Sequence, residues 1–397
     1  MIQYSYFNQF IDFYDKNKPK KPKNPNRDNA VLQVPIGAVY NAIVSVGRPY
    51  KPSNSMYYAT DIVQWKVSMV HAFFEEVNDE IAFKNLELLE GSEKTNLGYF
   101  IGMTFAHIFV QFHFQVRYTQ HLSEDPNLKV YHKNSLVKKF PDLWAKGPDN
   151  SSYLIEAKGS TVASKTYMDN KFIKQAHEQL ESVSSIEFIT GNRTETYNET
   201  NCNLKKLIVA AYPTIKTYPL KRRTPINHSA SNRVYLNVID PEGKDSEKIK
   251  IYGSEMIYKY YHFITKLLIE NMDATELKNL QQYDFILYSV PGMSLKIGML
   301  KQLFDRLRLD VIFERLITQN NILTDDDFRK SESYDYFNEL LDRLEIKGTE
   351  TFLDDVSGMT YFIGIDGLIS MYVKEHNEGL HPKKLPSAYF TKENKNL

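Results

Sequence analysis

The sequence predicts an α/β protein in which a mixed central sheet is flanked by helices. Between residues 97 and 211, a long apolar helix precedes three short strands, an amphipathic helix and a further strand. Helices repeat apolar residues every three to four positions, whereas half-buried strands alternate. A chain that mixes the two patterns in this order is typical of α/β architecture. Hydrophobic residues make up 42% of the 397 residues, enough for a sizeable core.

Two helices are expected before the first of these strands. Apolar residues recur at near-helical spacing over residues 61–89, which predicts one helix there. The second covers residues 97–117, and its stretch 97–116 is 20 residues without formal charge, long enough to cross a membrane. Two histidines and two glutamines within it are costly in lipid, so we interpret it as a buried helix and expect no membrane contact.

The following segments define the expected sheet and its covering helix. Residues 142–146 and 153–159 are strands on either side of a Gly-Pro-Asp-Asn turn, and 171–183 is an amphipathic helix. Residues 191–203 are polar and predict a loop. The remaining elements are strands at 128–131, 206–211, 234–239 and 285–290, helices at 255–270 and 295–317, and a hairpin within 361–372.

We divide the chain into three segments. Residues 1–60 form an N-terminal extension with a basic, proline-rich linker at 16–27, which is either solvated or in contact with phosphates. Residues 61–211 form the core, and 212–397 form a C-terminal region for recognition, partner binding or regulation.

Composition indicates the cellular compartment of the protein more clearly than it indicates what the protein binds. Lys plus Arg equals Asp plus Glu at 49 each, so net charge argues neither for nor against nucleic acid, and any basic surface must be local. The single cysteine, Cys202, excludes an intramolecular disulfide and fits a reducing compartment. No secretory signal is found at the N-terminus. We therefore expect a cytoplasmic protein.

The segment from Phe140 to Thr161 contains the candidate chemistry. If the turn is centred on Asp149, the strands pair so that Asp142 lies directly opposite Glu156. Directly opposed residues have Cβ atoms about 5 Å apart, which brings two carboxylates within reach of one divalent cation. Lys158 is two positions beyond Glu156 and shares its face of the strand.

These residue types suit phosphodiester hydrolysis. Mg²⁺ prefers oxygen ligands and keeps several waters, so two carboxylates leave room for a phosphate oxygen and an attacking water. Lys158 can hold or deprotonate that water or stabilise the developing charge. The sequence therefore predicts Asp142 and Glu156 as metal ligands and Lys158 as a catalytic residue.

The pattern Pro141-Asp142 followed by Glu156-Ala157-Lys158 resembles the core of the PD-(D/E)xK nuclease superfamily, which has the restriction-endonuclease-like fold. The resemblance covers about residues 97–211, under a third of the chain. It implies metal binding by the Asp and Glu and action of the Lys on the nucleophilic water. Many members place a Gln on the next helix, which Gln175 matches, with Gln179 one turn further. Members often have an acidic residue on the first helix, which 97–117 lacks.

The resemblance also implies a cofactor and a biological role. The cofactor would be Mg²⁺, with Mn²⁺ able to substitute, and the substrate would be DNA, cut by a restriction or phage-defence endonuclease. A protein partner or a homodimer would be compatible with double-strand cutting. The alternatives are a non-catalytic nucleic-acid-binding or regulatory subunit on the same fold, and an ordinary cross-strand charge cluster.

A basic and aromatic segment follows the core. Its basic residues are interleaved with tyrosines and prolines, which suits phosphate contact and base stacking, although a solvated loop has the same composition. The candidate nucleic-acid-binding residues are Lys205, Lys206, Lys216, Lys221, Arg222 and Arg223.

Overall fold

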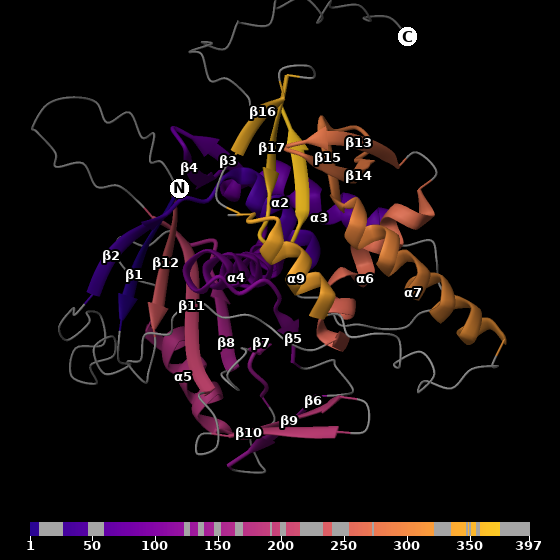
Figure 1. Cartoon of the computed structure of the whole chain (residues 1–397). Helices are drawn as coiled ribbons and strands as arrows, with labels where there is room; N and C mark the ends of the chain where they lie inside the picture. The colour runs from indigo at the N-terminus through magenta and orange to yellow at the C-terminus, as the bar shows by residue number, and fades with distance from the viewer. Residues whose placement is uncertain are drawn as a thin grey trace, which may run out of the picture.

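The computed structural model contains a mixed central sheet with helices on both faces, and a second sheet built mainly from the C-terminal region (Figure 1). It describes residues 1–7, 27–46, 59–122, 128–133, 139–146, 152–162, 170–190, 193–198, 204–214, 233–239, 254–271, 274–320, 335–346, 348, 351–354 and 358–373. The predicted α/β class with a mixed central sheet is confirmed.

The central sheet follows the order β2-β1-β12-β11-β8-β7-β5, and β4 pairs with β12 and β3 beside it. The pairs β8–β11 and β1–β12 are parallel, and the other pairs are antiparallel. The strands are β1 (Ile2–Phe7), β2 (Arg27–Leu32), β3 (Phe74–Val77), β4 (Glu80–Phe83), β5 (Gln120–His121), β7 (Leu143–Lys146), β8 (Ser152–Gly159), β11 (Leu204–Thr214) and β12 (Arg233–Ile239). All three predicted segments of the chain therefore contribute strands to this one sheet.

Two helices cover opposite faces of β8. The helix α4 (Gly91–Phe114) lies on the face of Tyr153, whose ring centroid is 5.1 Å from that of Phe114. The helix α5 (Asn170–Ser182) lies on the other face, where Gln179 contacts Lys158. Because successive side chains of a strand alternate between faces, α5 covers the face that holds Glu156 and Lys158.

The approach of α4 to β8 depends on three glycines. Gly98 and Gly102 lie one turn apart on α4 and face the backbone of Lys158 and Gly159. A β-carbon at Gly102 would lie 2.8 Å from the Gly159 nitrogen, and one at Gly159 would overlap the carbonyl oxygen of Gly98. The helix therefore sits directly on the strand end that bears Lys158.

Most of α4 is buried inside the protein. By length and composition it could cross a membrane, since its most apolar 18-residue window has a mean hydropathy of 1.2. However, 78% of that window is buried by the surrounding structure. Its apolar surface on all sides is matched by contacts with the central sheet, α2 (Ile36–Ser45) and β2.

The second sheet has the order β13-β14-β15-β18-β17-β16 and is antiparallel in every pair. Its strands are β13 (Thr275–Leu280), β14 (Tyr283–Ser289), β15 (Leu295–Leu300), β16 (Thr351–Asp354), β17 (Met359–Ile363) and β18 (Leu368–Tyr372), and the neighbouring helices include α6 (Ser254–Glu270), α7 (Lys301–Asn320) and α9 (Asp335–Arg343). The helix α2 also packs on it, because Gly37 lies against Phe362, Ser370 and Tyr372.

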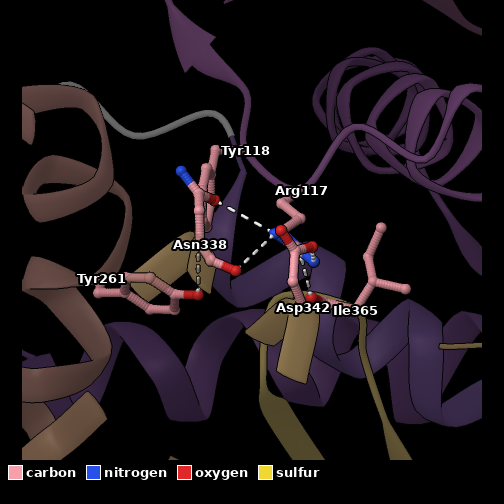
Figure 2. Close-up of polar contacts among 6 residues, drawn as sticks. All are labelled: Arg117, Tyr118, Tyr261, Asn338, Asp342 and Ile365. Carbon is pink, nitrogen blue, oxygen red and sulfur yellow. Dashed lines mark hydrogen bonds and ion pairs between the residues drawn. The ribbon is translucent and has the colours of Figure 1, made fainter. Parts of the chain in front are cut away.

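A partly buried polar junction connects α4 to this second sheet. Arg117, three residues after α4, donates to the Asp342 carboxylate at 2.6 Å, to Asn338 at 3.3 Å and to the Ile365 carbonyl at 3.2 Å (Figure 2). Within α4, Gln111 donates to Asp366 at 3.2 Å. The central sheet and the second sheet are thus both held by contacts with α4.

Three sequence predictions of local structure were wrong. The predicted helix 61–89 ends early: α3 covers Ala59–Phe73, and the hairpin β3–β4 follows through Asn78 and Asp79, whose φ values are 50° and 61°. The predicted loop 191–203 contains β10 (Arg193–Asn198), which joins β9 (Val183–Thr190) and β6 (Leu128–His132) in a small sheet. The first six residues of the predicted helix 295–317 form β15, because pairing with β14 and β18 overrides the helical pattern.

Replacing Gly102 by Ala should destabilise the protein by about 1–3 kcal/mol, because the contacted atoms are backbone and cannot move aside. The measurement is the free energy of unfolding in urea. Gly91→Ala, at the start of the same helix, is the control, since its β-carbon would meet nothing within 4 Å. Equal effects of the two substitutions would contradict the close contact between α4 and β8.

Candidate functional site

The predicted pairing of the two carboxylates is confirmed by the strand register. Leu143 pairs with Ile155, so Asp142, the residue before β7, stands opposite Glu156. The Asp142 backbone N–H donates to the Ile155 carbonyl at 3.1 Å. Its carboxylate accepts a hydrogen bond from the Ala157 N–H at 2.9 Å. The backbone of β8 therefore holds Asp142 beside Glu156.

Glu156 and Lys158 form a contact pair on the α5 face of β8. The side chain of Glu156 is 1% exposed and that of Lys158 is 21% exposed. The Lys158 ammonium donates to Oε1 of Glu156. Oε2 of Glu156 is buried and has no hydrogen-bond partner among the described residues. A buried carboxylate oxygen without a partner is unusual, because it has lost its hydration without replacement.

The electrostatics of the site oppose ionisation of the carboxylates when no cation is bound. Burial raises the pKa of Glu156 to about 8; the nearby charge of Asp142 also raises it, whereas Lys158 and the backbone of Asp142 lower it. Burial also raises the pKa of Asp142, against the opposing effects of Lys158, the Ala157 N–H and His121. A pair of buried carboxylates with raised pKa values is a common feature of functional sites.

The donor set fits Mg²⁺ better than a transition metal. Among the described residues, no group of three or more His, Cys, Asp or Glu side chains is arranged to hold a metal ion. Mg²⁺ needs no such group, because it is bound through one or two carboxylates together with waters and substrate phosphates. Glu93, just inside α4, accepts from the Glu90 N–H at 2.9 Å and so caps the helix. The candidate ligands for such an ion among the described residues are therefore Asp142 and Glu156.

The glutamine that contacts the site is Gln179 and not Gln175. Lys158 Nζ donates to Oε1 of Gln179 at 3.4 Å, and Nε2 of Gln179 donates to the Phe140 carbonyl at 3.4 Å. Gln175 is half-buried one turn earlier on α5, and the described contacts include none between it and Lys158. The helix is as predicted, but its rotation brings the later glutamine to the lysine.

The predicted basic surface is not observed at Lys205 and Lys206. Both lie in β11, between β8 and β12, and are buried. Lys205 Nζ lies 5.9 Å from the ring centroid of Phe114, and Lys206 Nζ lies 3.6 Å from a Glu181 oxygen. Helices on both faces of the sheet enclose these ammonium groups, which leaves them little access to a phosphate. The other predicted residues, Lys216, Lys221, Arg222 and Arg223, lie outside the described residues.

One neighbour of the site was missed by the sequence analysis. His121 lies on β5, which pairs with β7 at the edge of the sheet, and its Nε2 is 3.2 Å from the Tyr99 hydroxyl. The backbone N–H of Leu122 donates to the Asp142 carbonyl at 3.1 Å. A two-residue strand has no sequence signature of its own, so only the fold could reveal this position.

Comparison of the chain with protein-family models, with curated proteins and with solved structures finds no match. The geometry of Asp142, Glu156 and Lys158 is therefore the basis on which we infer a function.

The raised pKa of Glu156 predicts a pH-dependent stability for the metal-free protein. Between about pH 4.5 and pH 8 the folded state keeps a proton on Glu156 that the unfolded chain has lost. The folded state then binds more protons, so the free energy of unfolding should fall as pH rises through this window. Unfolding in EDTA at several pH values measures this slope.

Glu156→Gln should reduce the slope, because a neutral amide has no proton to release. Glu178→Gln is the control, since Glu178 is exposed on α5 and its side chain is 61% exposed. A slope that Glu156→Gln leaves unchanged would show that the Glu156 carboxyl titrates alike in both states.

Proposed function

We propose that this protein is a Mg²⁺-dependent nuclease that hydrolyses DNA phosphodiester bonds. The single observation that carries the proposal is the buried carboxylate of Glu156, which lies opposite Asp142, contacts Lys158 and has one oxygen without a described partner. A cation would provide the missing partner for that oxygen and favour the charged form of both carboxylates. The PD-(D/E)xK resemblance assigns the same three residues.

The proposed roles follow from charge and position. Asp142 and Glu156 would hold Mg²⁺, or Mn²⁺ in its place, which when bound supplies polarisation of the phosphate and a lower pKa for the attacking water. Lys158 has part of its side chain exposed beside Glu156, where an ammonium can hold the water or stabilise negative charge on the phosphate. Gln179 is a positioning residue, because it accepts from Lys158 and is itself held by the Phe140 carbonyl.

The biological setting remains part of the proposal. Large flanking regions around such a core are typical of restriction and phage-defence nucleases, which act on DNA in the cytoplasm. The second sheet would then recognise the target, bind a protein partner or restrain the enzyme, and a homodimer would supply two active sites. The contacts of Arg117 support a restraining role of the second sheet, because they connect α9 to the helix that packs on β8.

Lys158→Ala should reduce the rate of DNA cleavage at least about 100-fold, the lower end of what a catalytic proton-transfer or charge-stabilising group contributes. The assay incubates the protein with supercoiled plasmid and single-stranded DNA, in Mg²⁺ or in EDTA. Lys174→Ala is the matched control, since Lys174 lies on α5 and pairs with Glu178 in an exposed ion pair.

Cleavage that persists in EDTA, or that Lys158→Ala and Lys174→Ala reduce equally, would contradict the proposed site. Absence of cleavage by the wild type, together with Mg²⁺-independent DNA binding, would favour the non-catalytic alternative.

A further inference from the structure

An exposed aromatic ring lies next to the candidate site on the face of Lys158. Phe140 is 40% exposed and precedes Pro141-Asp142. Its carbonyl accepts from Gln179, which in turn accepts from Lys158. One side of the ring is supported by His132, with a centroid distance of 5.4 Å and an interplanar angle of 60°. The backbone of Phe140 is thus connected to Lys158 through Gln179, and the Phe140 ring remains open to solvent.

A second group of rings reaches the site from the α4 face. Tyr99 lies in the turn of α4 between Gly98 and Gly102, the turn that packs on Gly159. Its ring centroid is 5.6 Å from that of Phe100, and the Phe100 centroid is 5.1 Å from that of Trp65 on α3. We call Tyr99, Phe100 and Trp65 the aromatic row. Tyr99 is 46% exposed and Trp65 is 53% exposed.

The aromatic row ends beside Asp142. The Tyr99 hydroxyl is 3.2 Å from Nε2 of His121, and His121 pairs with Leu143, the residue after Asp142. The strand β5 that carries His121 is two residues long and is the end strand in the order of the central sheet. Two exposed rings are therefore connected to the site, Phe140 through Gln179 and Tyr99 through His121 on the short edge strand β5.

Exposed rings of this kind have a specific use beside a phosphodiester-cleaving site. A base can stack on an aromatic side chain only if its own face is free, which is true of an unpaired strand and not of bases inside a duplex. Stacking also needs no basic surface at the rings themselves, and Lys205 and Lys206 supply none because they are buried.

We propose that the substrate of this site is an unpaired DNA strand whose bases stack on Phe140 and on the aromatic row. The strand passes the Asp142 carboxylate and crosses the β5 edge of the sheet. This inference rests on the proposed nuclease function for the identity of the site, but the stacking itself needs neither metal nor cleavage. Exposed rings could instead form a protein interface, which the experiment includes as an outcome.

Binding is measured in EDTA, so that no cleavage can occur. The probe is an oligothymidylate longer than the roughly 4–16 nucleotides that stacking sites cover, against a duplex of equal length. Of the two tryptophans, Trp144 is fully buried and Trp65 is exposed, so quenching of the exposed tryptophan reports stacking on the row. Fluorescence anisotropy of a labelled oligothymidylate gives the affinity of each variant.

We expect the oligothymidylate to quench Trp65 emission. The duplex should bind at least about 10-fold more weakly than the oligothymidylate. Phe140→Ala and Tyr99→Ala should each weaken binding of the oligothymidylate about 10-fold, the scale of one lost stacked base. Tyr99→Phe keeps the ring and should bind like the wild type. Tyr336→Ala removes an exposed ring from α9 and should have no effect.

Equal binding of both probes without quenching would overturn the inference, as would equal effects of Tyr99→Ala and Tyr336→Ala. Loss of self-association in Trp65→Ala, measured by sedimentation, without oligonucleotide binding by the wild type would assign the rings to a protein interface and also overturn it. Stacking in EDTA with no cleavage in Mg²⁺ would support the inference and remove the nuclease function. Mg²⁺-dependent cleavage of duplex without quenching would support the nuclease function and overturn the stacking inference.

Discussion

The contact between α4 and the end of β8 is the constraint on which the rest of the structure depends. Gly102 and Gly159 allow the helix to touch the backbone of the strand, because a β-carbon at either glycine would clash with backbone atoms of the other element. Arg117, three residues after the end of the same helix, connects it to α9 and to the turn after β17. One buried helix thus supports the strand that carries the candidate site and fixes the second sheet to it.

This packing explains why the site has unusual electrostatics. With α4 on one face of β8 and α5 on the other, Glu156 is removed from water almost completely. Lys158 compensates for one carboxylate oxygen and leaves the other without a described partner. Burying a polar oxygen without a hydrogen-bond partner costs free energy whether or not the carboxyl is charged, so the folded protein retains such a group only where other interactions stabilise the fold. The extensive core around α4 supplies that stabilisation.

Much of this arrangement could be predicted from sequence, because it depends on local patterns. A hairpin turn sets the register of its two strands, so the opposition of Asp142 and Glu156 followed from their distance to the turn. The alternation of side chains put Lys158 on the same face. The apolar pattern of α4 and the amphipathic pattern of α5 also predicted the helices that enclose the strand.

What the sequence could not predict depends on contacts between distant residues. The addition of β1, β2 and β12 to the central sheet has no local signature, and neither has the pairing that makes Leu295–Leu300 a strand. Lys205 and Lys206 suggested an exposed basic segment because their burial depends on helices elsewhere in the chain. The choice of Gln179 over Gln175 depends on the rotation of α5 against the sheet, which periodicity alone does not determine.

If Asp142 and Glu156 together bind a divalent cation, calorimetric titration of the full chain with Mg²⁺ will detect it. We expect the wild type to bind Mg²⁺ near neutral pH with release of protons, because burial raises the pKa of both carboxyls. Glu156→Gln should abolish this binding, and Glu178→Gln should preserve it. Absence of binding by the wild type, or equal binding by Glu156→Gln, would show that the two carboxylates do not form a metal site.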